Sequence, residues 1–537
     1  MPATGPRIGV SPAAEHARRA RLWSALEEAH AVSFEARPDG ALGELDAAIA
    51  FGADAGAALA AAGLPGLVVH GAETKADLAT ATLSNSLALD RPLRGARLTE
   101  AHAVALPSGS AEAQGEVLAM LDGRPAWTLT GKPEAPLHHV GCAPAELAQD
   151  EALRQRLQPG RCLALLALVQ FLRHLLAHTD IPPAHEDDGR GAVADPDGVD
   201  RRGPAHGRPA ETPLQAAFVI DDPNLHRPRY GHLRYEELLR DARAHGYHLS
   251  IAMVPLDAWF ADPRLARMFR DGADHLSISI HGNTHEGPEL SRPDSLEAGI
   301  SLASHALRRM AAFERRTGVT VDRVMVPPHE QISEPMARAL VACGFAGLCT
   351  TRPYPWLAKT PQAPWLTRPP EAGPLAGWRP ADVVAGGLPV LLRADFALHP
   401  REDLVLRAFL GQPLILYGHH ELLRGGPADL AAAAAEIDGL GEVRWGSLGQ
   451  IARGLPGAAA AEAAPAGAAT SVARRATGHE PNGDTAHGPN GDTVPARGAM
   501  SPAQLAAIPS PPRRLRPVAR RVAAESEVRL RALLAQE

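Results

Sequence analysis

The chain has 537 residues, which is longer than one hydrophobic core ordinarily supports, so we expect two folded units together with unstructured segments. With 45% hydrophobic and 21% charged residues it is typical of globular protein, and this composition excludes fibrous and membrane-spanning classes. The formal net charge of -7 argues against nucleic acid as a partner, because phosphate backbones attract a basic surface.

Residues 1–180 are predicted to form an accessory α/β domain. Short apolar runs such as RIGV, DAAIAFGA and GLVVHG alternate with helical stretches, and this alternation is typical of a largely parallel sheet. Two hairpin-like runs, 117–131 and 136–143, precede an apolar helix that ends near His178. Residues 181–213 contain much Pro, Gly, Asp and Arg and little to bury, so we predict a flexible linker there.

Residues 214–455 repeat a strand-then-helix rhythm about seven times, which predicts a distorted (β/α)7-type barrel. The expected strands include AAFVIDD, HLSIAMV, HLSISIHG, VDRVMVPP, PLILYGHHE and VRWGSLG. The longest helix is expected from Ser295 to Thr317. The fold class is therefore α/β.

Residues 456–537 are predicted to form a disordered tail. They are rich in Ala, Gly and Pro, and the pentapeptide PNGDT begins both at Pro481 and at Pro489. Such low-complexity sequence buries too little to offset its ordering entropy. The last stretch, RRLRPVARRVAAESEVRLRALLAQE, is compatible with a basic amphipathic helix that either docks on a partner or an anionic membrane surface, or is simply solvated.

The cysteines and the N-terminus indicate a compartment. Four cysteines in no CxxC spacing are too few for a disulfide framework, so we interpret them as buried thiols in a reducing environment. The first residues lack the apolar segment of a signal peptide, and the chain has no apolar stretch of ~20 residues. We therefore expect a cytoplasmic protein without a transmembrane segment.

The first chemical motif is Asp221-Asp222, directly after the apolar run AAFVI. This position places two carboxylates at the C-terminal end of a strand, where β/α barrels keep their active sites. The alternative is that one of the pair caps the following loop, as Asp often does.

The second motif is HLSISIHGNTHE, in which an alternating strand delivers His281 and, four residues later, His285. Imidazoles at this spacing can converge on one metal ion from a loop or a first helical turn. Because the chain has 24 histidines, two unrelated surface histidines are the alternative. Both motifs nevertheless lie at the C-terminal ends of strands that are one strand apart in the repeat, so their side chains are expected at one barrel mouth.

Two later strand ends add candidates. VDRVMVPPHE runs into Pro327 and Pro328, which shape a rigid loop before His329 and Glu330. PLILYGHHE ends in adjacent histidines, which point to opposite sides of an extended backbone, so only one can face the site. We favour His419 over the next residue as a general acid.

The order of these motifs resembles the polysaccharide deacetylase family, the NodB-homology domains of carbohydrate esterase family four. That family carries a strand ending in Asp-Asp, then His-x-x-x-His, then an arginine-containing proline loop, and finally a strand ending in Leu-x-His. The resemblance implies that Asp221 is the base, that Asp222, His281 and His285 bind the metal, and that His419 is the acid.

The resemblance covers residues 215–453 and departs from the family in two places. The arginine expected before the proline loop is absent, since Met325 and Val326 occupy that stretch, and His329 replaces the usual tyrosine. In the family, this arginine orients the base, and the backbone N–H after the proline binds the oxyanion. The backbone donor survives a side-chain change, but the charge must come from elsewhere, and Arg393 in VLLRADF is the candidate.

Two further resemblances concern the context of the barrel. The DDPNLH and YGHHE segments look closer to the cytoplasmic branch associated with O-antigen and other surface-glycan loci (WbmS-like), which implies a role in lipopolysaccharide biosynthesis. Residues 1–180 resemble the flavodoxin- or amidotransferase-like domains that precede some hydrolases. They contain no nucleophile elbow and no phosphate loop, so an accessory packing or substrate-presenting role is expected.

The expected reaction is amide hydrolysis that removes N-acetyl groups from a sugar or a surface-glycan precursor. One divalent metal ion is implied, with zinc favoured by the imidazole ligands and cobalt or nickel as alternatives. An aromatic content of 4% offers no row of rings for a long polymer and favours a small or lipid-linked glycan. Two alternatives stay open: a catalytically silent barrel that binds a glycan or a partner protein, and a hydrolase of non-sugar amides.

Overall fold

A computed structural model gives the fold of the chain. It describes residues 5–38, 44–52, 54–71, 77–108, 110–177, 212–356, 373–398 and 400–455. Nearly all of the predicted linker, 181–213, and the whole predicted tail, 456–537, lie outside the described residues. Residues Met1–Ala463 form one compact unit, so the boundary between an accessory domain and a barrel stays a prediction.

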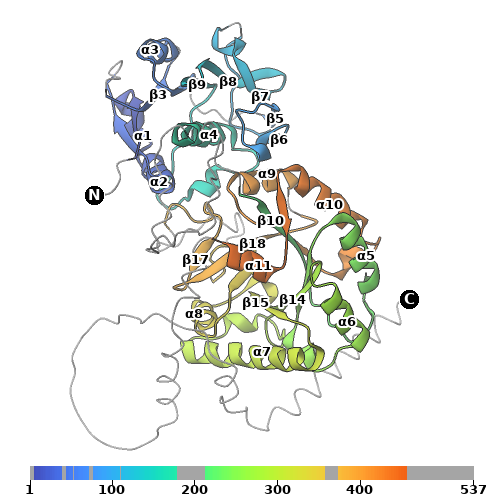
Figure 1. The fold of residues 1–537 in the computed structure, drawn as a ribbon. Coiled ribbons are helices and arrows are strands. Elements are labelled where there is room, and N and C mark those ends of the chain that lie inside the picture. Colours follow the sequence, from blue (N-terminus) through green and yellow to red (C-terminus); the bar gives the residue numbers. More distant parts are fainter. Residues whose placement is uncertain are drawn as a thin grey trace, which may run out of the picture. The chain divides into compact units, whose positions relative to one another are not determined.

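The N-terminal part contains a nine-stranded mixed sheet (Figure 1), in the order β2-β1-β3-β4-β9-β8-β7-β5-β6. The first five strands are parallel: β2 (Ser33–Ala36), β1 (Arg7–Ser11), β3 (Ala47–Phe51), β4 (Gly66–Val69) and β9 (Ala135–Val140). The others pair antiparallel: β8 (Arg124–Lys132), β7 (Glu116–Leu121), β5 (Ala79–Leu83) and β6 (Arg97–Glu100). The parallel half has the strand order of flavodoxin-type folds, which confirms the predicted class.

Four helices accompany this sheet: α1 (Ala13–Arg18), α2 (Ala20–His30), α3 (Ala55–Ala62) and α4 (Leu163–Ala177). The sequence LALLALVQFLRHLLA makes α4 apolar on almost every side, and ten of its side chains are buried. The core around α4 also includes Trp378, Leu406 and Phe409 from the C-terminal half. The N-terminal sheet therefore shares its hydrophobic core with residues that lie much later in the sequence.

Seven parallel strands close into a barrel. Strand β10 pairs with both β13 and β19, which completes the ring β10-β13-β14-β15-β16-β18-β19. The strands are β10 (Leu214–Asp221), β13 (Leu249–Met253), β14 (Leu276–His281), β15 (Val321–Val326), β16 (Gly347–Thr350), β18 (Leu388–Asp395) and β19 (Leu414–Gly418). The predicted seven-stranded β/α barrel is confirmed.

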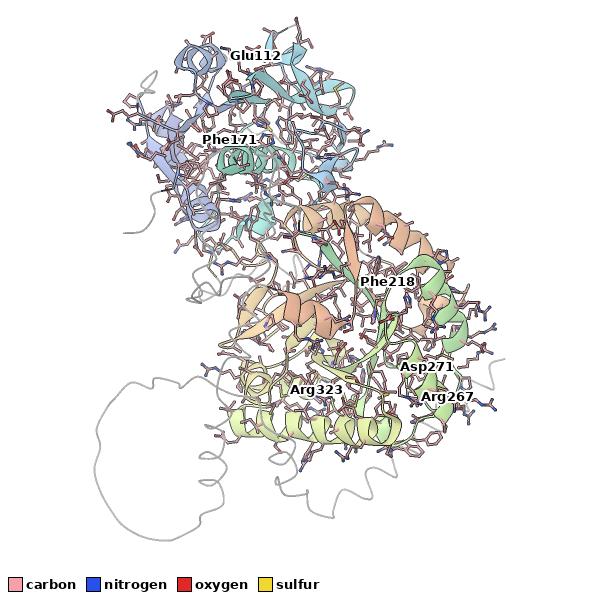
Figure 2. The ribbon with its side chains drawn as sticks, in the orientation of Figure 1. Glu112, Phe171, Phe218, Arg267, Asp271 and Arg323 are labelled. Carbon is pink, nitrogen blue, oxygen red and sulfur yellow. The ribbon has the colours of Figure 1, made fainter. Side chains whose placement is uncertain are left out.

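Helices cover the outside of the barrel in Figure 1: α5 (Tyr235–His245), α6 (Pro263–Asp271), α7 (Leu296–Thr317), α8 (Glu334–Ala342), α9 (Arg401–Phe409) and α10 (Ala428–Gly439). Helix α11 (Leu448–Gly454) differs from these, because Leu448, Ile451 and Ala452 share one hydrophobic cluster with side chains from the barrel strands, Val219, Val324 and Leu391 among them. The expected long helix is α7, and the Ser295 hydroxyl caps it by accepting the Ala298 N–H. Figure 2 shows Arg267 and Asp271 on the outer face of α6, whereas Phe218 lies among the barrel strands.

Four strand assignments in the C-terminal half differ from the sequence pattern. Strands β16 and β18 were not predicted, because β16 has only four residues and β18 carries Pro389 after two glycines, which reads as a turn. The expected strand in VRWGSLG is β20 (Val443–Trp445), which pairs with the start of β10 outside the ring. A shorter strand, β17 (Asp382–Val384), pairs antiparallel with β18.

Two broader expectations can be compared with the structure. All four cysteines are buried free thiols. Within the described ranges, none of the helices has the length and apolar character needed to cross a bilayer.

Candidate metal centre

The strand ends that the sequence singled out meet at one mouth of the barrel. Asp221 is the last residue of β10, and Asp222 follows it with a left-handed φ of 82°. His281 ends β14, which is separated from β10 by β13 alone, and His285 follows in the loop. The backbone N–H of Asp222 donates to the carbonyl of Ala252 on β13, between these strands. Parallel pairing thus brings together the carboxyl ends that carry the two motifs.

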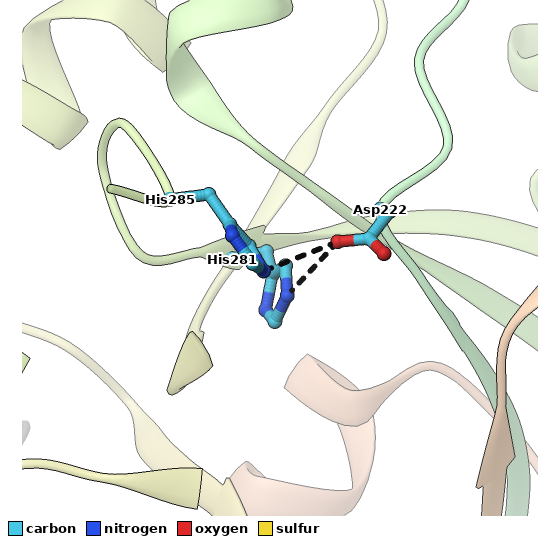
Figure 3. Close-up of side chains that lie close together, drawn as sticks. All are labelled: Asp222, His281 and His285. Carbon is cyan, nitrogen blue, oxygen red and sulfur yellow. Dashed lines mark ion pairs between the residues drawn. The ribbon is translucent and has the colours of Figure 1, made fainter. Parts of the chain in front are cut away.

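Asp222, His281 and His285 form a ligand-like cluster, shown in Figure 3. The Asp222 Oδ1 atom lies 3.4 Å from Nε2 of His281 and 3.3 Å from Nε2 of His285. All three ligand atoms lie within 4.8 Å of one another, and among the described residues no other such group occurs. One carboxylate with two imidazoles is a donor set that suits zinc, cobalt or nickel and leaves positions for water and substrate.

A backbone carbonyl fixes the orientation of the His281 ring. Its Nδ1–H donates to the carbonyl of Val326, at 2.9 Å, on the adjacent strand β15. The other ring nitrogen, Nε2, faces Oδ1 of Asp222 and is the one that could bind a metal ion. This is the arrangement in which a protein hydrogen bond selects the tautomer of a metal-binding histidine.

The loop that carries His285 is built around Glu289 of η5 (Glu289–Ser291). The buried Glu289 carboxylate accepts the backbone N–H groups of Asn283, Thr284 and His285, at 2.6 to 3.1 Å. This bonding holds His285 at a φ of 56°, which non-glycine residues rarely adopt. Gly282 begins the turn at a φ of 63°, where a Cβ would meet the Glu289 carboxylate at 2.6 Å.

Glu289 was not among the predicted site residues. The reversal of the chain after His281 was visible in the run GNTHEG, but nothing local identifies which acid accepts its N–H groups. Arg309 from α7 adds a second brace, because its Nη1 donates to both the carbonyl and the Oδ1 of Asn283.

Asp221 is held by a buried arginine. Nη1 and Nη2 of Arg393 each donate to one oxygen of Asp221, both at 2.8 Å, and both side chains are at most 4% exposed. The guanidinium also lies over the Tyr417 ring, 3.9 Å from its centroid. The sequence proposed Arg393 as the replacement for the missing motif arginine, and the structure places it against Asp221.

Arg393 is shared with a second carboxylate. Its Nε donates to Glu330 at 2.8 Å, while Glu330 also accepts from the Thr350 hydroxyl and the Thr351 N–H. Glu330 and the preceding His329 both have a φ of 58°, so the loop after Pro328 makes two successive left-handed steps. Buried carboxylates of this kind are tolerated when charge and hydrogen bonds compensate them.

The charges around the cluster shift several pKa values. Burial alone raises the pKa of Asp221, but the positive charge and hydrogen bonds of Arg393 reverse this and leave it below its usual range. Burial likewise opposes ionisation of Asp222, while His281 and His285 lower its pKa to about 2. Both acids are therefore ionised at neutral pH.

The two candidate acids differ in their surroundings. The His419 side chain is 53% exposed, and its Nε2 lies 4.0 Å from Oδ2 of Asp222. His420 instead packs beside Tyr230 and His232, at ring distances of 5.6 and 5.7 Å, in the short hairpin of β11 (Arg229–Tyr230) and β12 (Leu233–Arg234). Of the pair, His419 is the one placed at the cluster.

Two more residues at this mouth were missed by the sequence pattern. Asp257, in η4 (Pro255–Trp259) after β13, has a pKa raised first by burial, and the charges of Asp222 and His285 also act on it. Burial raises the pKa of Tyr230, and the charges of Asp222 and Asp257 raise it further. Neither residue belongs to a recognisable motif. His329, which the sequence placed here, has its ring 5.0 Å from that of His285.

No family model and no curated protein matches this sequence. A proposed polysaccharide deacetylase from Mycobacterium smegmatis is similar in structure, at 16% identity over 45% of this chain and 90% of that one, with a TM-score of 0.31. A family 4 acetyl xylan esterase from Clostridium thermocellum, in complex with a cobalt ion, is 13% identical over 46% of this chain and 96% of that one, with a TM-score of 0.26. A lactam utilization protein from Thermus thermophilus is 15% identical over 44% of this chain and 99% of that one, with a TM-score of 0.26. Because these scores are low, the argument below rests on the chain's own residues.

Proposed function

We propose that the barrel is a metal-dependent hydrolase that removes N-acetyl groups from a sugar or a surface-glycan precursor. The observation that carries this proposal is one constellation: the cluster of Asp222, His281 and His285 beside a second carboxylate, Asp221, that Arg393 holds in place. A ligand set next to an oriented base is what metal-assisted amide hydrolysis requires.

Asp222, His281 and His285 would hold one divalent ion, zinc in our proposal, with cobalt or nickel as alternatives. Such an ion polarises the amide carbonyl and makes a water molecule more acidic. The protein residues then divide the remaining work. Their roles follow from position and from protonation state.

Asp221 accepts the proton of the attacking water. Arg393 keeps this carboxylate ionised and fixes its plane, because both oxygens are bound by one rigid guanidinium. The lowered pKa makes Asp221 a weaker base than a free carboxylate, but it ensures that the ionised form is present. The missing motif arginine was the reason to consider a silent barrel, and the Arg393 contact removes that reason.

His419 protonates the leaving amine. It is more than half exposed at the mouth, so its ring can turn towards a bound substrate and exchange protons with water. The backbone N–H of His329, directly after Pro328, binds the oxyanion of the tetrahedral intermediate. Both assignments follow the family pattern that the sequence resembles.

The proposal extends to the setting of the enzyme. The resemblance to the WbmS-like branch favours a substrate from surface-glycan biosynthesis, and buried free thiols agree with a cytoplasmic location. The N-terminal sheet is proposed to support the barrel or present substrate, since its core extends into residues of the C-terminal half.

The decisive experiment is acetate release from a panel of N-acetylated mono- and disaccharides by the full-length protein. It is run with zinc, cobalt or nickel and after chelation, with cyclic and linear non-sugar amides in parallel. We expect metal-dependent acetate release from sugars. Full metal occupancy without turnover of any substrate would show a silent barrel, and turnover of non-sugar amides alone would redirect the proposal to that class.

A further inference from the structure

Two adjacent aromatic rings are exposed at the end of the loop that follows β13. Trp259 ends η4 and is 69% exposed, and the adjacent Phe260 is 42% exposed. Large aromatic side chains are ordinarily well buried, so adjacent exposed rings mark a surface that binds something. Their ring centroids lie 5.7 Å apart with an interplanar angle of 37°.

A third ring joins them from another loop. His226, in the loop after β10, has its ring 5.1 Å from Trp259 and 5.9 Å from Phe260. Its Nε2–H donates to the carbonyl of Asp257 at 2.7 Å, which fixes the imidazole against η4. Three rings from two loops therefore form one aromatic cluster, defined here as Trp259, Phe260 and His226.

The aromatic cluster is tied to the metal-centre loops through the backbone. The Leu256 N–H donates to the carbonyl of Asn283, in the loop between His281 and His285, at 2.9 Å. On the other side, Asn224 from the Asp222 loop donates to the Asp257 carboxylate at 3.3 Å. Trp259 is thus carried on a short helix that is hydrogen-bonded to both ligand-bearing loops.

We propose that Trp259, with Phe260 and His226, forms a stacking subsite for a pyranose ring of the substrate. One face of a pyranose is a patch of C–H groups, which packs on an aromatic ring while the hydroxyls stay in water. This inference rests on the proposed deacetylase function, because the ring that stacks there belongs to the sugar next to the acetamide that reacts. A cluster of two exposed rings, rather than a row, fits a substrate of one or two sugars.

The test separates binding from turnover. Affinity for N,N′-diacetylchitobiose is measured by calorimetry on the zinc-loaded full-length protein in an Asp221→Asn background, so that no substrate is consumed. In that background we compare Trp259→Ala, Trp259→Leu and Trp259→Phe, with Leu78→Ala as a control at a residue that directly precedes β5 and is 74% exposed. Melting temperatures verify that every variant is folded.

We expect Trp259→Ala and Trp259→Leu each to weaken binding roughly 3- to 10-fold, the size of one aromatic contact. Trp259→Phe should retain most of the affinity, and Leu78→Ala all of it. A leucine as effective as phenylalanine, or an alanine without effect, would overturn the stacking subsite.

Kinetics distinguish the two proposals. In the otherwise wild-type protein, Trp259→Ala should raise KM several-fold and change kcat little. Acetate release with an unchanged KM would leave the deacetylase standing and reject the subsite. Ring-dependent sugar binding without any acetate release would leave the subsite standing and reject the deacetylase.

Discussion

Histidines gather at the carboxyl ends of parallel strands in both halves of the chain, and the two groups behave in opposite ways. In the N-terminal sheet, His138 and His139 lie near the C-terminal end of β9, and His70 follows β4. Their hydrogen-bond partners are neutral: Trp127 donates to His138, Thr130 bonds His139, and His70 pairs with His139. The charge of Glu112 acts on His70 and His139, but burial outweighs it. In the barrel, the partners of the histidines are carboxylates.

The difference shows in the pKa values. Burial lowers the pKa of His139 to about 4 and that of His138 far below its usual range. Burial also acts to lower the pKa of His281, but Asp221 and Asp222 more than reverse it, so that pKa is raised. Histidine clusters alone therefore do not define a cation site. What distinguishes the barrel cluster is a carboxylate oxygen grouped with both imidazole nitrogens, which supplies the negative potential that attracts a cation.

The largest expected effect separates the two carboxylates. Asp221→Asn should keep the metal and lower acetate release roughly 100- to 10,000-fold, because the amide has the shape of the base without its basicity. Asp222→Asn should instead weaken metal binding, since an anionic ligand becomes neutral. Metal content and initial rates of both purified variants are measured. Full activity of Asp221→Asn, or wild-type metal content in both, contradicts the assigned roles.

The next test compares the two histidine groups directly. Wild-type protein should hold about one divalent ion per chain, as a three-ligand site predicts. His281→Ala should lose it, whereas His139→Gln, at the end of a strand in the N-terminal sheet, should not. Elemental analysis after gel filtration gives the metal per folded chain. Equal metal content in the two variants would break the contrast between the clusters.

The buried arginine offers a third test. Arg393→Met leaves Asp221 and Glu330 without a counter-charge, so it should lower the free energy of unfolding by about 3–5 kcal/mol. Arg323→Met is the control, because Arg323 also pairs with a glutamate, Glu314, but is 33% exposed. There the loss should be about 0–1 kcal/mol. Urea unfolding monitored by circular dichroism measures both, and similar losses would show that the Arg393 network is not special.

Acid should affect the N-terminal histidines. The pKa of His139 is lowered on folding, so the unfolded chain binds the proton more readily, and stability is lost as pH falls from about 6.5 towards about 4. His139→Gln cannot titrate and should flatten this dependence. Melting temperatures between pH 7 and pH 4 provide the measurement. An identical pH profile for the variant would show that His139 does not contribute.

The smallest effect is expected from removing the residues after Ala460. The low-complexity sequence there should contribute little to a core, so melting temperature and acetate release should stay within experimental error of the full-length protein. A clear drop in melting temperature would show that the terminal basic segment docks on the rest of the chain.

Features of the fold and the site that depend on local sequence patterns could be predicted from the sequence. Apolar strands that end in Asp-Asp or run into His-x-x-x-His mark their own termini, so the barrel class and the positions of Asp222, His281 and His285 followed from it. Arg393 was found by a different route, as the charge that a missing arginine requires. The catalytic and ligand roles of these residues stay predictions.

Other parts of the site depend on contacts between distant segments. Glu289 and Asp257 lie in no motif, and their importance appears only once three loops converge. Trp259 is another case, because the low aromatic content argues against a sugar platform, while the fold leaves Trp259 and Phe260 exposed after a short helix that is hydrogen-bonded to both loops of the cluster. Strand β16 was missed for a third reason: four residues show too little periodicity to be recognised.

Ring closure also sets the order in which the site is completed during synthesis. The candidate ligands Asp222 and His285 are synthesised first, Arg393 follows about a hundred residues later, and β19, which closes the barrel against β10, is the last strand of the ring. A nascent chain therefore possesses the side chains of the candidate metal centre before it possesses the arginine that orients Asp221. The bidentate contact between Arg393 and Asp221 can form only after β18 has been synthesised, and the barrel closes only when β19 pairs with β10.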